Sequence, residues 1–145
     1  LSNRKQAGDT LINLSLFNGQ QVEVNIPNVD FHDLLQQSDF ISFHVPAQEK
    51  PIIGNAELAL LKEGVGLVNT SRGGVIDEEA LLEGLESGKI SFAGLDTFEK
   101  EPTPSIRVLM NPNMSLSPHI GASTLEAQDR IGLELAERIL EMTRQ

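Results

Sequence analysis

Residues 65–96, VGLVNTSRGGVIDEEALLEGLESGKISFAGLD, contain a strand, a helix and a second strand in succession. The predicted strands 65–71 and 90–98 are largely apolar, which is typical of strands buried within a parallel sheet. Between them, Asp77 is placed to cap a helix that Gly88 ends. Two short apolar strands joined by a helix predict a βαβ unit, in which the strands run parallel.

The same alternation of strands and helices continues on both sides of this unit. We expect strands at 40–46 and 114–117, a short helix or turn at 106–111, and helices at 55–63 and 123–144. The last of these helices has apolar residues at helical spacing. The pattern predicts an α/β fold with a parallel sheet that helices cover on both faces.

The N-terminal residues follow a different pattern. Residues 1–9 form a polar lead-in, and two alternating runs predict a β-hairpin from Thr10 to Ile26 with a two-residue turn at Asn18-Gly19. Asp30 can cap a short helix over 31–37. We therefore expect a lead-in and hairpin over 1–27 and the α/β part over 28–145.

Composition excludes several classes of partner. The formal net charge of −10 and the pI of about 4.6 argue against nucleic acid, because phosphate binding needs clustered Lys and Arg. No apolar run approaches the roughly 18 residues that span a bilayer, so no membrane partner is expected. There are no cysteines, which excludes disulfides and thiolate metal sites and favours a cytoplasmic location. We predict no metal site.

Polar residues with complementary chemistry follow the predicted strands. In an open α/β sheet, ligands bind beyond the carboxyl ends of the strands, where this sequence places Arg72, Asp96, Glu101 and His119. A guanidinium binds a carboxylate through two parallel hydrogen bonds, and an imidazole transfers protons near neutral pH. A nearby carboxylate orients the imidazole. Together these groups suit the interconversion of a 2-hydroxy acid and a 2-keto acid with a nicotinamide carrying the hydride.

Each of these residues also has a structural explanation when it is taken alone. Arg72 could be a surface ion-pair donor, Glu101 a solvated loop residue and His119 a structural histidine, while Asp96 could cap the turn that follows it. Residue types alone leave both explanations open.

The sequences of four segments resemble those of one enzyme family. NTSRGGVIDEEAL (69–81), GLDTFEKEP (94–102), SPHIGAST (117–124) and SDFISFHVP (38–46) are similar to segments of the D-isomer-specific 2-hydroxyacid dehydrogenases. The resemblance extends over about residues 29–140 and implies a Rossmann-like NAD-binding domain. It is greatest to members that convert 3-phosphoglycerate to 3-phosphohydroxypyruvate in serine biosynthesis, with other D-2-hydroxy acids as the next candidates. It also implies a homo-oligomer.

The resemblance assigns roles residue by residue. It implies that Arg72 binds the substrate carboxylate, that His119 is the acid and base, and that Glu101 is the partner of His119. The residues that it implies for NAD are Val45 and Pro46 on the adenosine side, and Thr70, Ser71, Arg72, Asp96, His119, Ile120, Gly121 and Ala122 around the nicotinamide.

One expected motif is absent. The sequence has no G-x-G-x-x-G, the glycine-rich turn that holds the pyrophosphate at a helix N-terminus. We therefore expect the C-terminal half of an NAD-binding domain, entered just after the residue that would bind the adenosine ribose. In the family topology the strand at 40–46 would then form a bare, apolar sheet edge, which favours association.

Two other functions are compatible with the same residues. One is an NAD-sensing, corepressor-like binding protein on the same fold, which recruits partners and turns over no metabolite. The other is an inactive fragment that lacks the pyrophosphate-binding half.

Overall fold

The computed structural model describes residues 10–143. The chain divides into two compact units, the first ending at Leu34 and the second beginning at Leu35. The predicted lead-in at 1–9 and the last residue of the predicted C-terminal helix, Arg144, lie outside the described residues.

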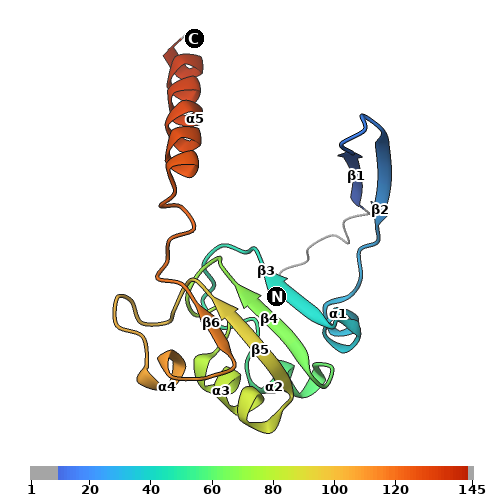
Figure 1. The fold of residues 1–145 in the computed structure, drawn as a ribbon, viewed down its shortest axis with the longest axis vertical. Helices are drawn as coiled ribbons and strands as arrows, with labels where there is room; N and C mark the ends of the chain where they lie inside the picture. The colour runs from blue at the N-terminus through green and yellow to red at the C-terminus, as the bar shows by residue number, and fades with distance from the viewer. Residues whose placement is uncertain (1–9, 144–145) are drawn as a thin grey trace. The chain divides into compact units, whose positions relative to one another are not determined.

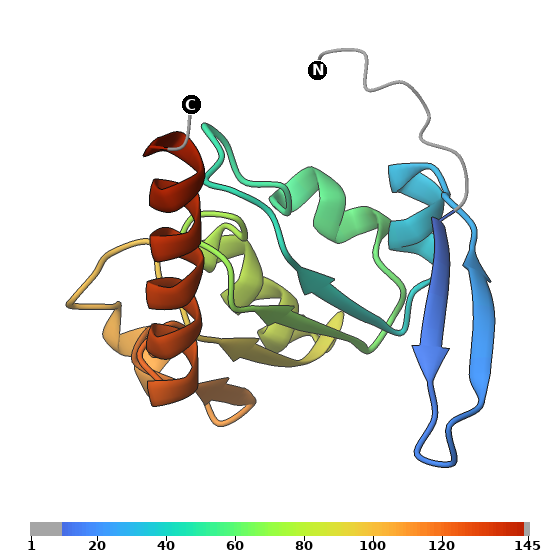
Figure 2. The same ribbon diagram turned by 90° about the horizontal axis from the view of Figure 1, so that it is seen from above.

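The predicted hairpin is present in the first unit. Strands β1 (Thr10–Ser15) and β2 (Gln21–Ile26) pair antiparallel, with Ser15 opposite Gln21 (Figure 2). The predicted two-residue turn was wrong. Leu16 N–H donates to the carbonyl of Gln20 at 2.8 Å, so Phe17, Asn18 and Gly19 form the loop. Gly19 has φ +80°, whereas Asn18 does not take the positive φ that a two-residue type I′ turn would require.

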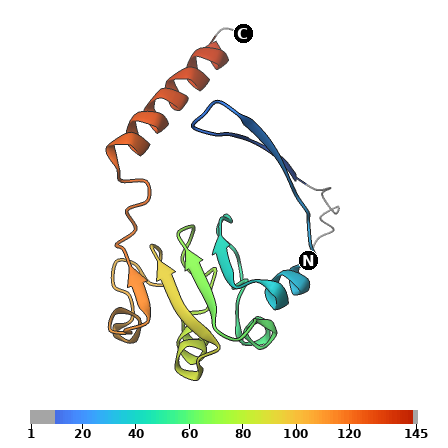
Figure 3. The ribbon, with the colours of Figure 1, turned by 45° about the vertical axis from the view of Figure 1, so that its right-hand side comes forward.

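The predicted parallel sheet forms the second unit. It contains β3 (Phe40–Phe43), β4 (Val65–Asn69), β5 (Ile90–Leu95) and β6 (Met114–Leu116). The strands lie side by side in the order β3-β4-β5-β6 and run parallel (Figures 1 and 3). This confirms the Rossmann-like α/β fold class, and it places β3 at an edge of the sheet as expected.

Helices connect the strands close to the predicted positions. They are α1 (Phe31–Gln37), α2 (Asn55–Leu60), α3 (Glu78–Ser87), α4 (Ile106–Leu109) and α5 (Leu125–Thr143). Helix α3 begins and ends as its sequence predicts: the Asp77 carboxylate accepts a hydrogen bond from Ala80 N–H, and Gly88 has φ +78°. Helix α2 is shorter than predicted, because the backbone is already extended at Leu61.

Helices α2, α3 and α4 cover one face of the sheet. Ile41, Leu67 and Ala93 on that face are buried, whereas Phe40 and Phe92 on the opposite face are 72% and 39% exposed. The prediction that these helices cover both faces was wrong. Successive right-handed crossovers that move across a sheet in one direction place every connecting helix on the same side.

Helix α5 is a long amphipathic helix, as its sequence predicts. Ala127 is its one buried residue, and its apolar side chains are largely exposed in the described chain, among them Ile131 at 54% and Leu135 at 58%. Among the helices of residues 10–143, none is both long and apolar enough to cross a membrane.

Candidate active site

The carboxyl ends of β4, β5 and β6 lead into loops that surround one hollow. It has a volume of about 350 Å³ and is lined by Ala47, Arg72, Gly73, Gly74, Phe98, Glu99, Glu101 and His119. Parallel strands end at the same edge of a sheet, which is why these residues meet there with Ala47 from the loop after β3. The three residues predicted to be catalytic, Arg72, Glu101 and His119, therefore share one site.

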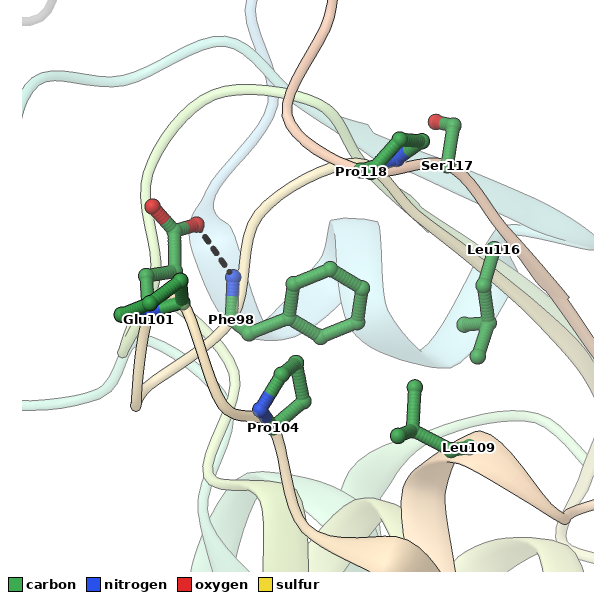
Figure 4. A pocket seen from close by; sticks show the side chains of 8 residues that line it. Phe98, Glu101, Pro104, Leu109, Leu116, Ser117 and Pro118 are labelled. Atoms are coloured by element: carbon green, nitrogen blue, oxygen red, sulfur yellow. Dashed lines mark hydrogen bonds between the residues drawn. The ribbon is translucent and has the colours of Figure 1, made fainter.

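Glu101 and His119 form a close pair in this hollow. Glu101 Oε2 lies 2.7 Å from His119 Nδ1, and Glu101 Oε1 accepts a hydrogen bond from Phe98 N–H at 3.0 Å, the bond drawn in Figure 4. The bond with His119, supported by the Phe98 N–H, lowers the pKa of Glu101 below its ordinary value. Both side chains remain partly exposed, so the pair is accessible to a small molecule.

The backbone at His119 is held in an unusual conformation. His119 has φ +53°, in the left-handed region that residues other than glycine adopt at a cost of about 1–3 kcal/mol. Asp96 stabilises this turn from both sides. Its Oδ1 accepts from Ser117 Oγ at 2.6 Å and Ile120 N–H at 3.0 Å, and its Oδ2 accepts from Gly121 N–H at 3.0 Å.

The charge of Asp96 suits this task. Burial acts to raise the pKa of its carboxyl, but the hydrogen bonds from Ser117, Ile120 and Gly121 outweigh burial, and the pKa lies below its ordinary value. Asp96 is therefore an ionised anchor inside the protein, only 4% exposed. The sequence placed this residue in the site, and the structure shows that both of its oxygens are engaged by the turn.

Asn69 is a site residue to which the sequence analysis assigned no role. It is 2% exposed at the end of β4. Its amide donates to the carbonyl of Arg72 at 2.9 Å, and its Oδ1 accepts from Ser71 N–H and Ser71 Oγ at 3.1 and 2.8 Å. Asn69 thus holds the turn that contains the predicted residues Thr70, Ser71 and Arg72. An asparagine that ends an apolar strand was the available signal, since a buried amide needs partners.

Gly73 brings the Arg72 loop into direct contact with the loop that follows β5. A β-carbon on Gly73 would lie 1.9 Å from the carbonyl oxygen of Phe98. No side chain fits at that distance, so glycine is required for this approach. The contact fixes the loop of Arg72 beside the loop of Glu101.

A second, largely apolar pocket shares Phe98 and Glu101 with the first hollow. It has a volume of about 470 Å³, and Figure 4 shows the ring of Phe98 at its centre. The side chains that form its walls are largely apolar: Phe98, Pro102, Pro104, Leu109, Leu116 and Pro118. Phe98 and Glu101 therefore line both cavities.

The remaining predicted residues lie near the site without lining the hollow. Val45 is half-buried and Pro46 exposed, just beyond the carboxyl end of β3. Ala122 lies in the turn that Ser123 N–H closes onto the carbonyl of Ile120. Ala47, which was not predicted, and Glu99, which was assigned no role, also line the hollow. Within residues 10–143, no three His, Asp or Glu side chains are arranged to hold a metal ion.

Comparison with known proteins agrees with the geometry. Residues 10–121 match the family model described as the NAD-binding domain of the D-isomer-specific 2-hydroxyacid dehydrogenases. The chain belongs to this family. Members of the D-isomer-specific 2-hydroxyacid dehydrogenases bind NAD through this domain, and the match includes the hairpin as well as the parallel sheet.

Named relatives in this dehydrogenase family act on different small acids. A hydroxypyruvate reductase of Thermotoga maritima is 51% identical over 124 residues, which are 82% of this chain and 40% of that protein. A D-3-phosphoglycerate dehydrogenase of Archaeoglobus fulgidus is 42% identical over 84% of this chain and 24% of that protein. The crystal structure of a glyoxylate reductase from Paecilomyes thermophila superposes with a TM-score of 0.69 at 47% identity, covering 72% of this chain and 33% of that one. The chain thus spans less than half the length of these proteins.

Proposed function

We propose that the protein is an NAD-dependent dehydrogenase that interconverts a D-2-hydroxy acid and the matching 2-keto acid. The observation that carries this proposal is the Glu101–His119 pair at 2.7 Å, in a hollow that Arg72 also lines. The Arg72 guanidinium donates through Nη1 to the carbonyl of Ser71 at 2.7 Å. This set supplies a carboxylate binder and a proton carrier within reach of one small molecule.

Each residue has one task in this mechanism. Arg72 binds the substrate carboxylate and holds C2 in the hollow. Because Nδ1 of His119 is engaged by Glu101, Nε2 takes the proton of the 2-hydroxyl group as the C2–O bond becomes a carbonyl. Glu101 stabilises the imidazolium that forms, and the steps reverse in the reduction of the keto acid. A nicotinamide held beside Arg72 and His119 would supply the hydride acceptor for C2.

The residues present fit the nicotinamide end of the dinucleotide. Gly74 lines the hollow without a side chain, and a β-carbon there would meet nothing within 4 Å, so a planar ring can approach the backbone at this residue. We assign the nicotinamide to the turn Thr70–Arg72, to Asp96 and to the turn 119–122, and the adenosine to Val45 and Pro46. The sequence contains no pyrophosphate-binding glycine motif. Binding of the pyrophosphate would therefore depend on residues other than these 145.

The substrate that we propose is 3-phosphoglycerate, oxidised to 3-phosphohydroxypyruvate as a step toward serine, in the cytoplasm and in a homo-oligomer. This choice of substrate is supported by the sequence PHIGAST at 118–124 and by the Archaeoglobus relative. Hydroxypyruvate is the second candidate, because the Thermotoga relative bears that name at 51% identity.

A substrate panel tests this proposal. NADH consumption is measured with the protein and phosphohydroxypyruvate, hydroxypyruvate or glyoxylate, each beside a His119→Ala variant. A kcat/KM that is highest for phosphohydroxypyruvate and that falls in His119→Ala supports the assignment. A preference for hydroxypyruvate overturns the substrate but keeps the reaction. NADH binding without turnover of any keto acid overturns the reaction and favours an NAD-sensing binding protein.

A further inference from the structure

We propose that Glu78 and Glu99 form a reciprocal clamp that positions the loop of Arg72 against the loop of Glu101. Neither residue needs to touch substrate for this role, so both are positioning residues. The inference rests on the proposed function for its effect on catalysis, but the clamp itself is a property of the fold.

The clamp consists of two hydrogen bonds that cross between the same two residues. Glu78 Oε1 accepts from Glu99 N–H at 2.8 Å, and Glu99 Oε1 accepts from Glu78 N–H at 2.9 Å. Each carboxylate therefore holds the backbone of the other residue. Bonds from a backbone N–H to a carboxylate are stronger than bonds between neutral groups.

The two ends of the clamp lie next to the functional loops. Glu78 is the first residue of α3, and the loop that starts at Arg72 leads directly into it. Glu99 immediately follows Phe98, whose N–H supports the Glu101 carboxylate. The clamp therefore fixes the end of one loop to the start of the other.

The contact at Gly73 makes the same connection at a second point. With the Phe98 carbonyl packed against Gly73 and Glu99 bonded to Glu78, the segment 98–99 is held on both sides of one peptide. Two attachment points prevent the rotation that a single one would allow. The separation between the carboxylate binder and the Glu101–His119 pair is thus set by backbone contacts.

Burial and the negative charges of Glu99 and Glu79 act against the ionised form of Glu78, so the clamp forms in spite of these effects. Glu78 is 8% exposed, and burial, outweighing the Glu99 N–H bond, raises the pKa of its carboxyl above the ordinary value. In such a poorly solvated place, water competes little for the two groups of the hydrogen bond. Glu99, by contrast, is exposed and can be replaced without opening the core.

The test uses variants that separate the hydrogen bond from the side chain. Glu78→Gln keeps an oxygen acceptor for Glu99 N–H, whereas Glu78→Ala and the exposed Glu99→Ala each remove one arm. Glu83→Ala is the matched control, because Glu83 is an exposed glutamate on the same helix.

The first readout is independent of turnover. The pKa values of the Glu101 and Asp96 carboxyls are measured by carbon NMR on the 145-residue chain. We expect the pKa of Glu101 to rise toward its ordinary value in Glu78→Ala and Glu99→Ala, with Asp96 still low. Glu78→Gln and Glu83→Ala should match the wild type. An unchanged Glu101 pKa in Glu99→Ala overturns the clamp, and so does an equal rise at Asp96, which would indicate general loosening of the fold.

The second readout is steady-state kinetics of the holoenzyme. A misplaced loop is expected to lower kcat/KM for the keto acid by about tenfold to a hundredfold in Glu99→Ala, with most of the loss restored in Glu99→Gln. Equal activity of Glu99→Ala and wild type overturns the positioning role. A wild type without any turnover would refute the proposed function instead, and the NMR result would still decide the clamp.

Discussion

Replacing Asp96 is the sharpest perturbation of the site, because one carboxylate holds the whole turn that presents His119. In Asp96→Ala, the hydrogen bonds from Ser117, Ile120 and Gly121 are lost together. A net hydrogen bond contributes about 1 kcal/mol, and more when it involves a charge. Removing a buried carboxylate also removes its desolvation cost, which offsets part of the loss.

The solvent exposure of the N–H donors determines how large a loss of stability is expected. Ile120 is 49% exposed and Gly121 is also exposed, so water can replace the carboxylate at both N–H groups. The low end of the range therefore applies, and we expect Asp96→Ala to lower the free energy of unfolding by about 2–3 kcal/mol. Asp96→Asn keeps one oxygen acceptor but turns an NH₂ toward Gly121 N–H, which predicts a smaller loss of about 1–2 kcal/mol.

Urea unfolding of the chain at neutral pH measures these differences. Asp129→Ala is the control, since Asp129 is an exposed aspartate on α5, and its effect should stay within about 0.5 kcal/mol. A loss below about 1 kcal/mol in Asp96→Ala, or a larger loss in Asp96→Asn than in Asp96→Ala, would refute the anchoring role of this carboxylate.

Further predictions follow from single contacts. Gly73→Ala forces a β-carbon onto the carbonyl of Phe98, so urea unfolding should show a loss of about 1–3 kcal/mol, and wild-type stability would contradict the close approach. Thr97→Val removes a buried hydroxyl that has no partner among the described residues, so calorimetry should show a gain of about 1 kcal/mol, and a loss would mean that the hydroxyl is bonded. The pKa values of Asp96 and Glu101 lie below their ordinary 3.8 and 4.5, so the stability that both groups contribute is complete above pH 4.5 and is lost as the pH falls through the folded values. Acid titration of Asp96→Asn should therefore show a shallower loss of stability than the wild type, and identical acid profiles would contradict the direction of the Asp96 shift.

Local patterns in the sequence predicted most of the fold. The apolar runs of β4 and β5, the cap at Asp77 and the glycine at 88 are each decided by residues within a few positions of one another. The errors arose at features that residues nearby in the sequence do not determine. The turn at Asn18 depends on which residue takes a positive φ, and the coverage of the sheet depends on the direction in which successive crossovers run.

The residues of the site could be predicted from the sequence, but the hydrogen bonds that hold them in place could not. The rule that ligands bind at the carboxyl ends of strands, together with the family resemblance, selected Arg72, Glu101 and His119. The reciprocal bonds of Glu78 and Glu99 join residues 21 positions apart, and no periodicity in the sequence indicates such a pair. Likewise, nothing in the sequence shows that both oxygens of Asp96 are engaged by the turn at 119–121.

The most direct test of the central claim is the turnover number for NADH-dependent reduction of a 2-keto acid by the holoenzyme, compared between wild type, His119→Asn and His32→Asn. His32 is an exposed histidine on α1, outside the hollow, so its variant controls for loss of an imidazole as such. Proton transfer by His119 predicts a fall in kcat of about a hundredfold to ten-thousandfold in His119→Asn and wild-type turnover in His32→Asn. Wild-type turnover in His119→Asn would contradict the account.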